Sequence, residues 1–323
     1  MGKGGGGMYR LEPDAPYAVG VDVGGTKINA GIVDERGEVL HTVSVPTLAG
    51  SARTEDRIVL AIREVLGGAS GSLPPLALRG IGVGTAGQID WAEGAVRSAS
   101  DLLPGYAGTP LRRLLEAQFP LPVRVDNDVN VLALTEKRLG AARGVNDFIC
   151  LALGTGVGGA LVTGGRLVHG AWGGAGELGH LAVDLHGPPC LCGGRGCLEQ
   201  YASGTSIARR MRERLAAEGQ ADALIDAREV FARWHAGEPL AAALMQESMA
   251  ALGAAIASLI HMWNPQVVVI GGGVAEAGEH FFAELRAEAE RRTMPAMWAG
   301  VRIEPAYRGN WGGMIGAALQ LWE

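Results

Sequence analysis

The sequence is poor in aromatic residues, cysteine and positive charge. Aromatic residues make up 5% of the 323 residues and charged residues 19%, whereas hydrophobic residues make up 48%. The 28 lysines and arginines are outnumbered by 34 aspartates and glutamates, which gives a net charge of −6. Nucleic acids and anionic membranes are bound mainly by clustered cations, so the composition argues against both partners. The hydrophobic share suffices for a packed core and excludes a disordered chain.

Long apolar segments are also missing from the sequence. No uninterrupted run of 18 apolar residues occurs, so we expect no membrane-spanning segment. The first residues lack the apolar stretch of a secretion signal, and residues 1–16 are expected to form a flexible tail. We therefore expect a cytoplasmic protein.

Glycine is the residue in excess, with 51 copies in the chain. This is about twice the usual share of roughly 7%. The glycines follow no three-residue repeat and form no long tract, which excludes a collagen or a linker. They predict many sharp turns and close approaches of the backbone.

Two segments, one in each half of the chain, share a pattern of three strands joined by a glycine-rich turn and a tight turn. This pattern is typical of β-hairpins. The expected strands are 17–22, 28–33 and 38–45 in the first segment and 148–153, 159–163 and 166–169 in the second. The repetition predicts two related α/β domains facing each other across a cleft, with chance similarity as the alternative.

The remaining chain fits alternating helices and strands. The expected helices are 57–66, 111–118, 129–139, 207–218 and 241–263, and the expected strands are 78–83, 123–125 and 266–270. Asn264 and Pro265 should end the long helix. A further helix should run from the glycines 271–273 to about Arg292.

The glycine-rich turns differ from the common nucleotide motifs. The chain has no P-loop, and Gly82, Gly84 and Gly87 match the dinucleotide pattern only as a string, because no helix follows them. The turn that begins at Asp22 offers a carboxylate for a hydrated Mg²⁺ and backbone N–H groups for phosphate oxygens. An ordinary polar hairpin turn is the alternative.

Several residues of these turns are candidate phosphate contacts. In the second segment, Thr155 and Gly156 offer the same groups as the first turn, and Gly272 and Gly273 fit a ligand near a helix N-terminus. In the first segment the candidates are Asp22, Gly24, Gly25, Thr26 and Lys27.

Asp128 is the candidate general base. It lies between a short strand and an apolar helix in the stretch Asp126-Asn127-Asp128. As a base it would accept the proton of a substrate hydroxyl during phosphoryl transfer. As the alternative, Asp128 is only the N-cap of the helix.

Three of the four cysteines lie within eight residues. Cys190, Cys192 and Cys197 follow His180, and three thiolates with one imidazole form a closed tetrahedral site that suits structural Zn²⁺. Cysteines that merely pack in the core are the alternative. The metal would hold a loop that carries Glu177 and Glu199, whose carboxylates suit hydroxyl groups.

These motifs together resemble the ROK family of repressors, open reading frames and sugar kinases. The resemblance rests on residues 22–27, Asn127-Asp128, residues 176–180 and residues 190–199, and extends from about Tyr17 to the C-terminus. It implies a two-domain actin-like ATPase (ribonuclease H-like) fold that transfers a phosphoryl group from ATP to the 6-hydroxyl of a hexose.

The resemblance also implies roles for individual residues. Asp128 is the catalytic base, while Gly272 and Gly273 lie near the adenosine. Sugar hydroxyls are held by Asn127, Glu177, His180 and Glu199, and zinc is bound by His180, Cys190, Cys192 and Cys197. The expected domains are a small one of residues 17–134 and 307–323 and a large one of residues 135–306. A C-terminal helix over 313–322 returns to the small domain.

Glucose is the expected sugar, with N-acetylmannosamine, fructose, mannose and allose as alternatives. Family glucokinases often carry Asn-Leu-Pro-Gly-Trp beside the sugar, whereas residues 101–106 here read Asp-Leu-Leu-Pro-Gly-Tyr, and residues 84–87 lack the common Pro-Gly pair. Leu102 replaces the asparagine, or Asp101 takes over its role.

Two other functional classes compete with the kinase. A sugar-responsive repressor would require a DNA-binding segment ahead of the first strand, where the sequence has 16 glycine-rich residues, and a sugar-binding module would not require Asp128 and both phosphate turns. We expect a homodimer or homotetramer that uses ATP, Mg²⁺ and structural Zn²⁺.

Overall fold

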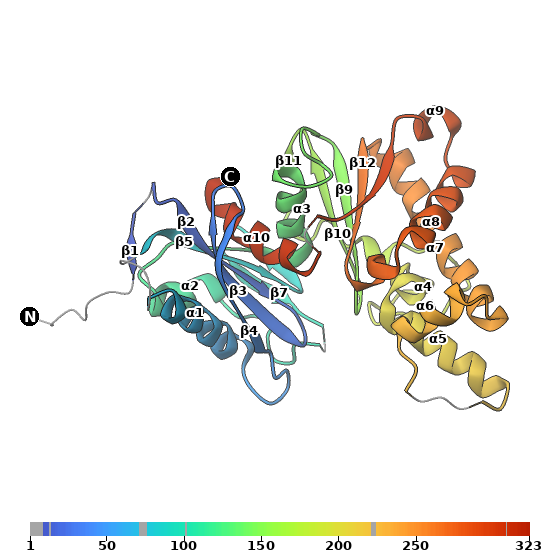
Figure 1. Ribbon diagram of the computed structural model, residues 1–323, viewed down its shortest axis with the longest axis horizontal. Helices are drawn as coiled ribbons and strands as arrows, with labels where there is room; N and C mark the ends of the chain where they lie inside the picture. The colour runs from blue at the N-terminus through green and yellow to red at the C-terminus, as the bar shows by residue number, and fades with distance from the viewer. Residues whose placement is uncertain (1–8, 13, 71–75, 101, 221–223, 308) are drawn as a thin grey trace, which may run out of the picture. The chain divides into compact units, whose positions relative to one another are not determined.

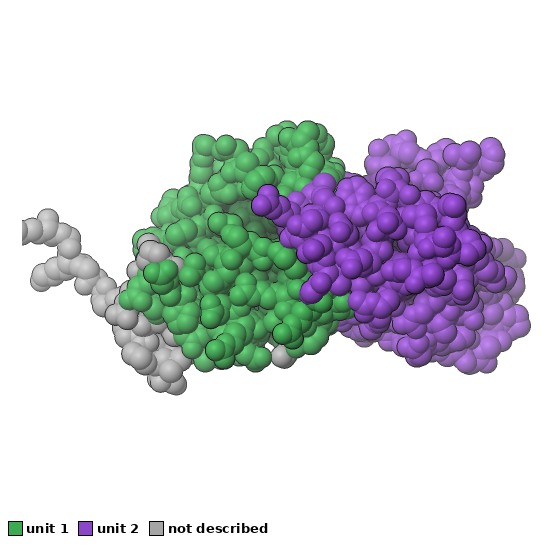
Figure 2. Space-filling model, turned by 90° about the horizontal axis from the view of Figure 1, so that it is seen from above, with its two compact units in different colours: residues 1–143, 169–175, 307–323 green, residues 144–168, 176–306 purple. Residues whose placement is uncertain are grey.

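The computed structural model describes residues 9–12, 14–70, 76–100, 102–220, 224–307 and 309–323. The chain divides into two compact units, shown in different colours in Figure 2. Unit 1 comprises residues 1–143, 169–175 and 307–323, and unit 2 comprises residues 144–168 and 176–306. Residues 135–143 and 169–175 thus group with unit 1, whereas the predicted large domain includes them.

Unit 1 contains a mixed sheet in the order β1-β5-β2-β3-β4, with β8 also paired to β5. Strands β2, β3 and β4 form an antiparallel meander, and β2, β5 and β8 run parallel. The strands are β1 (Tyr9–Leu11), β2 (Tyr17–Val23), β3 (Lys27–Asp34), β4 (Val39–Pro46), β5 (Leu76–Thr85) and β8 (Val123–Asn127). A small antiparallel pair joins β6 (Gln88–Asp90) to β7 (Ala95–Ser98).

Unit 2 contains a five-stranded sheet in the order β11-β10-β9-β12-β13. Strands β9, β10 and β11 are antiparallel, and β9, β12 and β13 run parallel. The strands are β9 (Phe148–Leu153), β10 (Val157–Thr163), β11 (Arg166–Leu167), β12 (Val267–Gly271) and β13 (Arg302–Pro305). A meander followed by two parallel strands thus occurs in both units, which confirms the prediction of two related α/β halves.

The helices of unit 1 cover its sheet (Figure 1). Helix α1 (Thr54–Ser70) packs against β3 and β4, and α2 (Leu111–Gln118) lies against β8. Helix α10 (Gly312–Leu319) packs against β2, β5 and α3 (Asp128–Arg138), and is followed by the 3₁₀ turn η4 (Gln320–Trp322). The C-terminal helix therefore packs on the N-terminal strands, as the resemblance implies.

Glycines in the sheet allow α10 to lie directly on the strand backbones. A Cβ atom added at Gly82 of β5 would lie 1.7 Å from the carbonyl oxygen of Ala317, and one at Gly20 of β2 would lie 2.1 Å from that of Met314. Neither neighbour is a flexible side chain, so only glycine fits at these positions.

Replacing Gly82 with alanine is therefore expected to destabilise the protein by more than about 3 kcal/mol, because the added methyl must displace a helix in a packed core. Gly67→Ala is the matched control. Gly67 lies exposed in α1 with no atom near the added Cβ, and alanine there should add up to about 1 kcal/mol of helix stability. Urea unfolding of both variants measures the contrast, and equal stabilities would contradict the packing argument.

The helices of unit 2 surround α7 (Pro239–Trp263), whose buried face belongs to the largest part of the hydrophobic core. The others are α4 (Glu199–Ala202), α5 (Gly204–Ala217), α6 (Ala227–His235), α8 (Glu279–Arg292) and α9 (Pro295–Trp298). Asn264 ends α7 in the left-handed conformation, as expected. Within the described ranges, α7 is the one helix long and apolar enough to cross a membrane, but 67% of its apolar window is buried, as in a core helix.

Two local expectations differ from the structure. The helix expected to run unbroken from the glycines 271–273 to Arg292 is a 3₁₀ turn, η2 (Gly273–Ala277), followed by α8. Gly278, at φ 88°, separates the two elements, because its positive φ cannot continue a helix. Residues 9–11, expected to be part of a flexible tail, instead pair with residues 76–78 of β5. The glycine-rich residues 1–8 lie outside the described ranges.

Candidate functional site

The ends of three parallel strands bring the acidic candidates of unit 1 together. Asp22 of β2 pairs in register with Gly84 of β5, and Gly84 pairs with Asp126 of β8. Parallel strands end at the same edge of a sheet, which is where such folds bind ligands. The turn after β2 and the beginning of α3 at Asp128 therefore lie at one edge.

The turn between β2 and β3 is held by its own backbone and by Thr47. The amide of Gly24 donates to the carbonyl of Lys27 at 3.0 Å, and the Thr47 hydroxyl donates to the carbonyl of Gly24 at 2.7 Å. The side chains of Thr26 and Lys27 are exposed. The turn is thus fixed while its hydroxyl and ammonium groups face solvent, as a phosphate contact requires.

Asp22 has an unusual protonation equilibrium. Burial, followed by the negative charge of Asp128, raises the pKa of its carboxyl from the ordinary 3.8 to about 7, against smaller opposing effects of Asn29 and Lys27. A buried carboxyl whose pKa is raised beside the negative charge of Asp128 forms, with Asp128, a donor set that suits a hard divalent cation such as Mg²⁺. A Mg²⁺ ion there would supply positive charge next to bound phosphates.

Asp22→Asn is expected to remove a pH-dependent loss of stability. Because the pKa of Asp22 is higher in the folded chain, ionising this carboxyl destabilises the fold as pH rises from about 4 to about 7. The asparagine variant should therefore be more stable than wild type at pH 8, by up to about 4 kcal/mol, and the difference should shrink toward pH 4.

Urea unfolding at pH 4.5 and pH 8 measures this difference. Asp147→Asn is the control of opposite sign, since hydrogen bonds from Thr163 and Gly164 lower the pKa of that exposed carboxyl. A stability difference for Asp22→Asn that does not change between the two pH values would contradict the assignment.

Asn127, not Asp128, caps helix α3. The Asn127 Oδ1 atom accepts hydrogen bonds from the amides of Val129 at 2.8 Å and Asn130 at 3.3 Å. Its Nδ2 atom donates to the carbonyl of Gly87 at 3.0 Å. The alternative reading of Asp128 as an N-cap is therefore wrong. Asp128 is instead the first residue of α3, half-buried, with its Oδ1 accepting from the Val129 amide at 3.0 Å.

The glycine turns of unit 2 also lie close together. The Gly154 amide donates to the carbonyl of Gly156 at 2.9 Å, and the carbonyl of Gly154 accepts from the amide of Gly204 at 2.8 Å. A Cβ atom added at Gly272, where φ is 84°, would lie 2.4 Å from the carbonyl oxygen of Leu153. The ends of β9 and β12 thus bring the turn of residues 154–156 next to Gly272 and Gly273.

The four candidate metal ligands converge in unit 2. One ligand atom each of His180, Cys190, Cys192 and Cys197 lies within 4.8 Å of all the others. The Sγ atom of Cys190 is 3.7 Å from Nδ1 of His180, and those of Cys192 and Cys197 are 3.6 Å apart. Tetrahedral Zn²⁺ with Zn–S bonds of about 2.3 Å requires separations of about 3.8 Å, so the donor set fits zinc.

The loop of residues 190–197 folds back on itself through a tight turn. The Cys190 amide donates to the carbonyl of Gly194 at 2.9 Å, and the Gly193 amide donates to the carbonyl of Cys190 at 3.0 Å. Gly193, at φ 90°, adopts a conformation that favours glycine. The cysteine spacing is therefore matched by a backbone that brings the thiols close together.

The predicted sugar-binding residues of unit 2 surround this loop. His180 lies in the 3₁₀ turn η1 (Leu178–His180), with Nδ1 toward Cys190 and Nε2 3.9 Å from the Glu177 carboxylate. Glu199 begins α4, and its Oε2 accepts from the Val157 amide at 2.9 Å. His180 therefore presents one ring nitrogen to the thiols and the other to Glu177.

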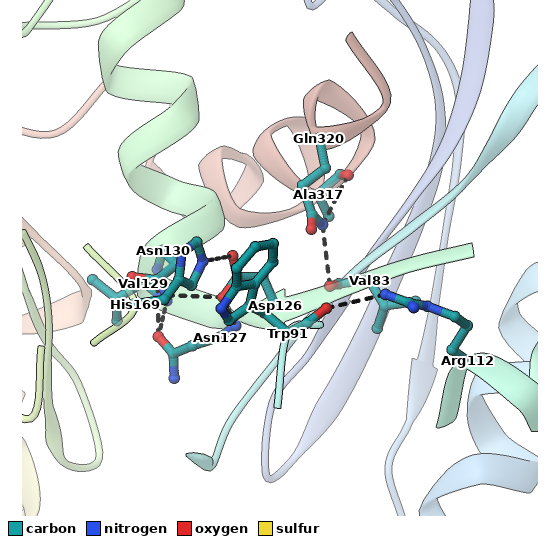
Figure 3. Close-up of polar contacts among 10 residues, drawn as sticks. All are labelled: Val83, Trp91, Arg112, Asp126, Asn127, Val129, Asn130, His169, Ala317 and Gln320. Carbon is teal, nitrogen blue, oxygen red and sulfur yellow. Dashed lines mark hydrogen bonds and ion pairs between the residues drawn. The ribbon is translucent and has the colours of Figure 1, made fainter. Parts of the chain in front are cut away.

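Tyr106 belongs to the stretch that departs from the family's sugar-contacting residues, whereas His169 carries no signal in the sequence. Tyr106 is buried in the core with its hydroxyl 3.2 Å from that of Thr85, so burial raises its pKa and the ring serves packing. The Nε2 atom of His169 lies 2.6 Å from Oδ2 of Asp126 (Figure 3). The two residues are 43 positions apart in the sequence, so no local sequence pattern reveals this contact. Leu102 is 46% exposed, and Asp101 lies outside the described residues.

Comparison with known proteins covers nearly the whole chain. The model of the ROK family matches residues 18–323. A glucokinase of Halalkalibacterium halodurans is 37% identical over 93% of this chain and 93% of its own. A putative xylose repressor of Caldicellulosiruptor sp. is 31% identical over 92% of this chain and 76% of its own.

Solved structures are similar over the same extent. The ROK hexokinase of Thermus thermophilus is 36% identical, with a TM-score of 0.80 over 95% of this chain and 98% of its own. A ROK family glucokinase of Streptomyces griseus, in complex with glucose and AMPPNP, is 34% identical, with a TM-score of 0.77 over 94% of this chain and 98% of its own.

Proposed function

The chain belongs to the ROK family, and from this premise we propose that it transfers the γ-phosphoryl group of ATP to the 6-hydroxyl of glucose. The chain is a sugar kinase with the actin-like ATPase fold, like the glucokinase and the two solved ROK kinases to which it is similar. The choice of glucose, the attacked hydroxyl and the residue roles are our proposal.

One observation carries the assignment of the base. The parallel strands β2 and β8 end at one edge of the sheet, and there Asp128 lies near enough to Asp22 to raise its pKa. The turn of residues 24–27 begins at the same edge. A base beside a cation-binding carboxylate and a phosphate-binding turn is the arrangement that phosphoryl transfer requires.

We assign the proton transfer to Asp128. As the 6-hydroxyl oxygen of glucose bonds to the γ-phosphorus, the bond to the ADP oxygen breaks and the hydroxyl proton passes to the Asp128 carboxylate. The chain's other contribution is to orient the reactants and neutralise charge.

The sugar hydroxyls are assigned to groups whose hydrogen bonding is incomplete. Asn127 uses one Nδ2 hydrogen for Gly87, and the second can reach a hydroxyl. Glu199 offers Oε1, since Oε2 is bonded to the Val157 amide. His180 offers Nε2–H and Glu177 its carboxylate, because a zinc-bound Nδ1 fixes the tautomer of the imidazole.

The nucleotide is assigned to the glycine-rich turns. Thr26 and Lys27 would contact its terminal phosphates, Thr155 and Gly156 would contact them from the turn in unit 2, and Gly272 and Gly273 would lie near the adenosine. Support comes from the fixed backbone and exposed side chains of these turns. Asp22 would hold Mg²⁺, and the zinc site of His180 and the three cysteines would be structural.

A substrate panel tests the proposal. With Mg·ATP and a coupled ADP assay, kcat/KM should be highest for glucose among glucose, mannose, fructose, allose and N-acetylmannosamine. A higher value for another sugar would replace glucose and leave the kinase assignment intact. The absence of turnover with all five sugars would instead favour the repressor or the sugar-binding module. The cytoplasmic location and a homodimeric or homotetrameric state stay predictions.

A further inference from the structure

A half-buried histidine contacts a buried aspartate two residues before the proposed base. The Nε2 atom of His169 is 2.6 Å from Oδ2 of Asp126, which is 6% exposed (Figure 3). Asp126 lies two residues before Asp128, near the end of β8. His169 begins the segment of residues 169–175, which follows β11 in the sequence but belongs to unit 1.

The second oxygen of Asp126 fixes the start of helix α3. Its Oδ1 accepts hydrogen bonds from the amide of Asn127 at 2.7 Å and from Nδ2 of Asn130 at 2.8 Å. The carboxylate therefore bonds to donors on both sides of Asp128 in the sequence, and His169 supplies the donor on the opposite oxygen. Burying a carboxylate is unfavourable unless it is fully hydrogen-bonded, so His169 completes this arrangement.

The imidazole of His169 is itself held in place. Its ring stacks on that of Trp91, with centroids 4.6 Å apart and planes inclined by 24°. Four residues after His169, a Cβ atom added at Gly173 would lie 1.9 Å from the carbonyl oxygen of Ile89, so the segment lies directly on β6. The guanidinium of Arg97 lies 5.4 Å from the ring of Trp172. The stacking on Trp91 and the close approach of Gly173 to β6 give the histidine a fixed position from which to hold Asp126.

We propose that His169 is a positioning residue for phosphoryl transfer: through Asp126 it fixes the turn that carries Asp128, without touching sugar or nucleotide. The inference rests on the proposed function, in which Asp128 is the base. It follows because Asp128 begins α3 immediately after a strand, so a rotation of the Asn127 peptide would move its carboxylate. Displacement of a reacting group by about 1 Å can lower a rate about 100-fold.

Two substitutions at His169 test the proposal. His169→Phe keeps the stacking on Trp91 but removes the donor, and should lower kcat for glucose about 10- to 100-fold with KM values for glucose and ATP within about twofold. His169→Gln restores an N–H donor toward Asp126 and should recover most of kcat. Adding Asp126→Asn to His169→Phe should lower kcat little further, because both changes interrupt the same contact.

Trp172→Leu is the matched control in the same segment. It removes the contact with Arg97 and leaves the pair of His169 and Asp126 unchanged, so it should leave kcat near the wild-type value. Thermal unfolding of every variant separates lost activity from lost folded protein.

Three results would overturn the proposal. The first is an unchanged kcat in folded His169→Phe. The second is a raised KM with unchanged kcat, which would make His169 a substrate contact. The third is a His169→Gln variant whose kcat is as low as that of His169→Phe. Failure of the proposed function has a different signature, namely an Asp128→Asn variant with near wild-type kcat. ¹H–¹⁵N spectra of the imidazole then still show whether Nε2 of His169 carries the proton shared with Asp126.

Discussion

Asp128→Asn is expected to lower kcat for glucose phosphorylation by about 10²- to 10⁴-fold, the usual contribution of a general base. The asparagine amide matches the carboxylate in size and can still accept the hydrogen bond from the Val129 amide. It cannot accept the proton of the sugar hydroxyl. Folding and glucose binding should therefore persist while turnover is lost.

Steady-state kinetics and glucose binding by calorimetry measure the two effects separately. Asp34→Asn is the matched control, since the Asp34 carboxylate of the same unit also accepts backbone hydrogen bonds, from Arg36 at 2.9 Å and Glu38 at 2.8 Å. It should leave kcat unchanged. A variant at position 128 that retains more than about a tenth of wild-type kcat would refute the role as base.

Loss of the proposed zinc site is the second change with a large expected effect. Cys197→Ser removes a buried thiol of that site, and should abolish stoichiometric zinc and destabilise the protein by more than about 4 kcal/mol. The physical reason is that the metal would join residues of one loop in which Leu185 and Leu191 are exposed. Activity should fall as well, because His180 and Glu199 flank this loop.

Metal analysis and thermal unfolding of the purified protein measure these effects. Cys150→Ala is the matched control, because Cys150 is a buried thiol of β9 outside the cluster. It should keep one zinc ion per chain. A wild-type protein that is folded and active after purification without zinc would contradict the assignment.

Much of the candidate site was predictable from the sequence because its signals are local. Three cysteines within eight residues limit the chain to a tight loop, and the ligand atoms do converge. Two glycine-rich turns between apolar strands predicted the repeated meander, which the strand order of both units confirms. The distance between side chains that are close in the sequence is limited by the short backbone between them, independently of the fold of the rest of the chain.

The domain boundaries and residue roles at the site stay predictions. The structure nevertheless decides two local points, namely which residue caps α3 and where the Tyr106 ring lies. The sequence offered Asp128 as the alternative N-cap, whereas its neighbour Asn127, a residue type that also caps helices, caps α3. The register of β5 and β8 decides it, because the Asn127 side chain bonds to Gly87 and to the first turn of α3. Tyr106, noted as a departure from the family's tryptophan, is a core residue beside Thr85.

The sequence by itself determined the chemistry available: the thiols and imidazole for a metal, the turns for phosphates and the carboxylates for a base. Only the tertiary structure decided which of these groups meet distant partners, as Asp126 meets His169 and Gly82 meets α10. The physical reason is that such contacts depend on strand register and helix packing summed over the whole core. A short sequence pattern specifies neither the strand register nor the helix packing.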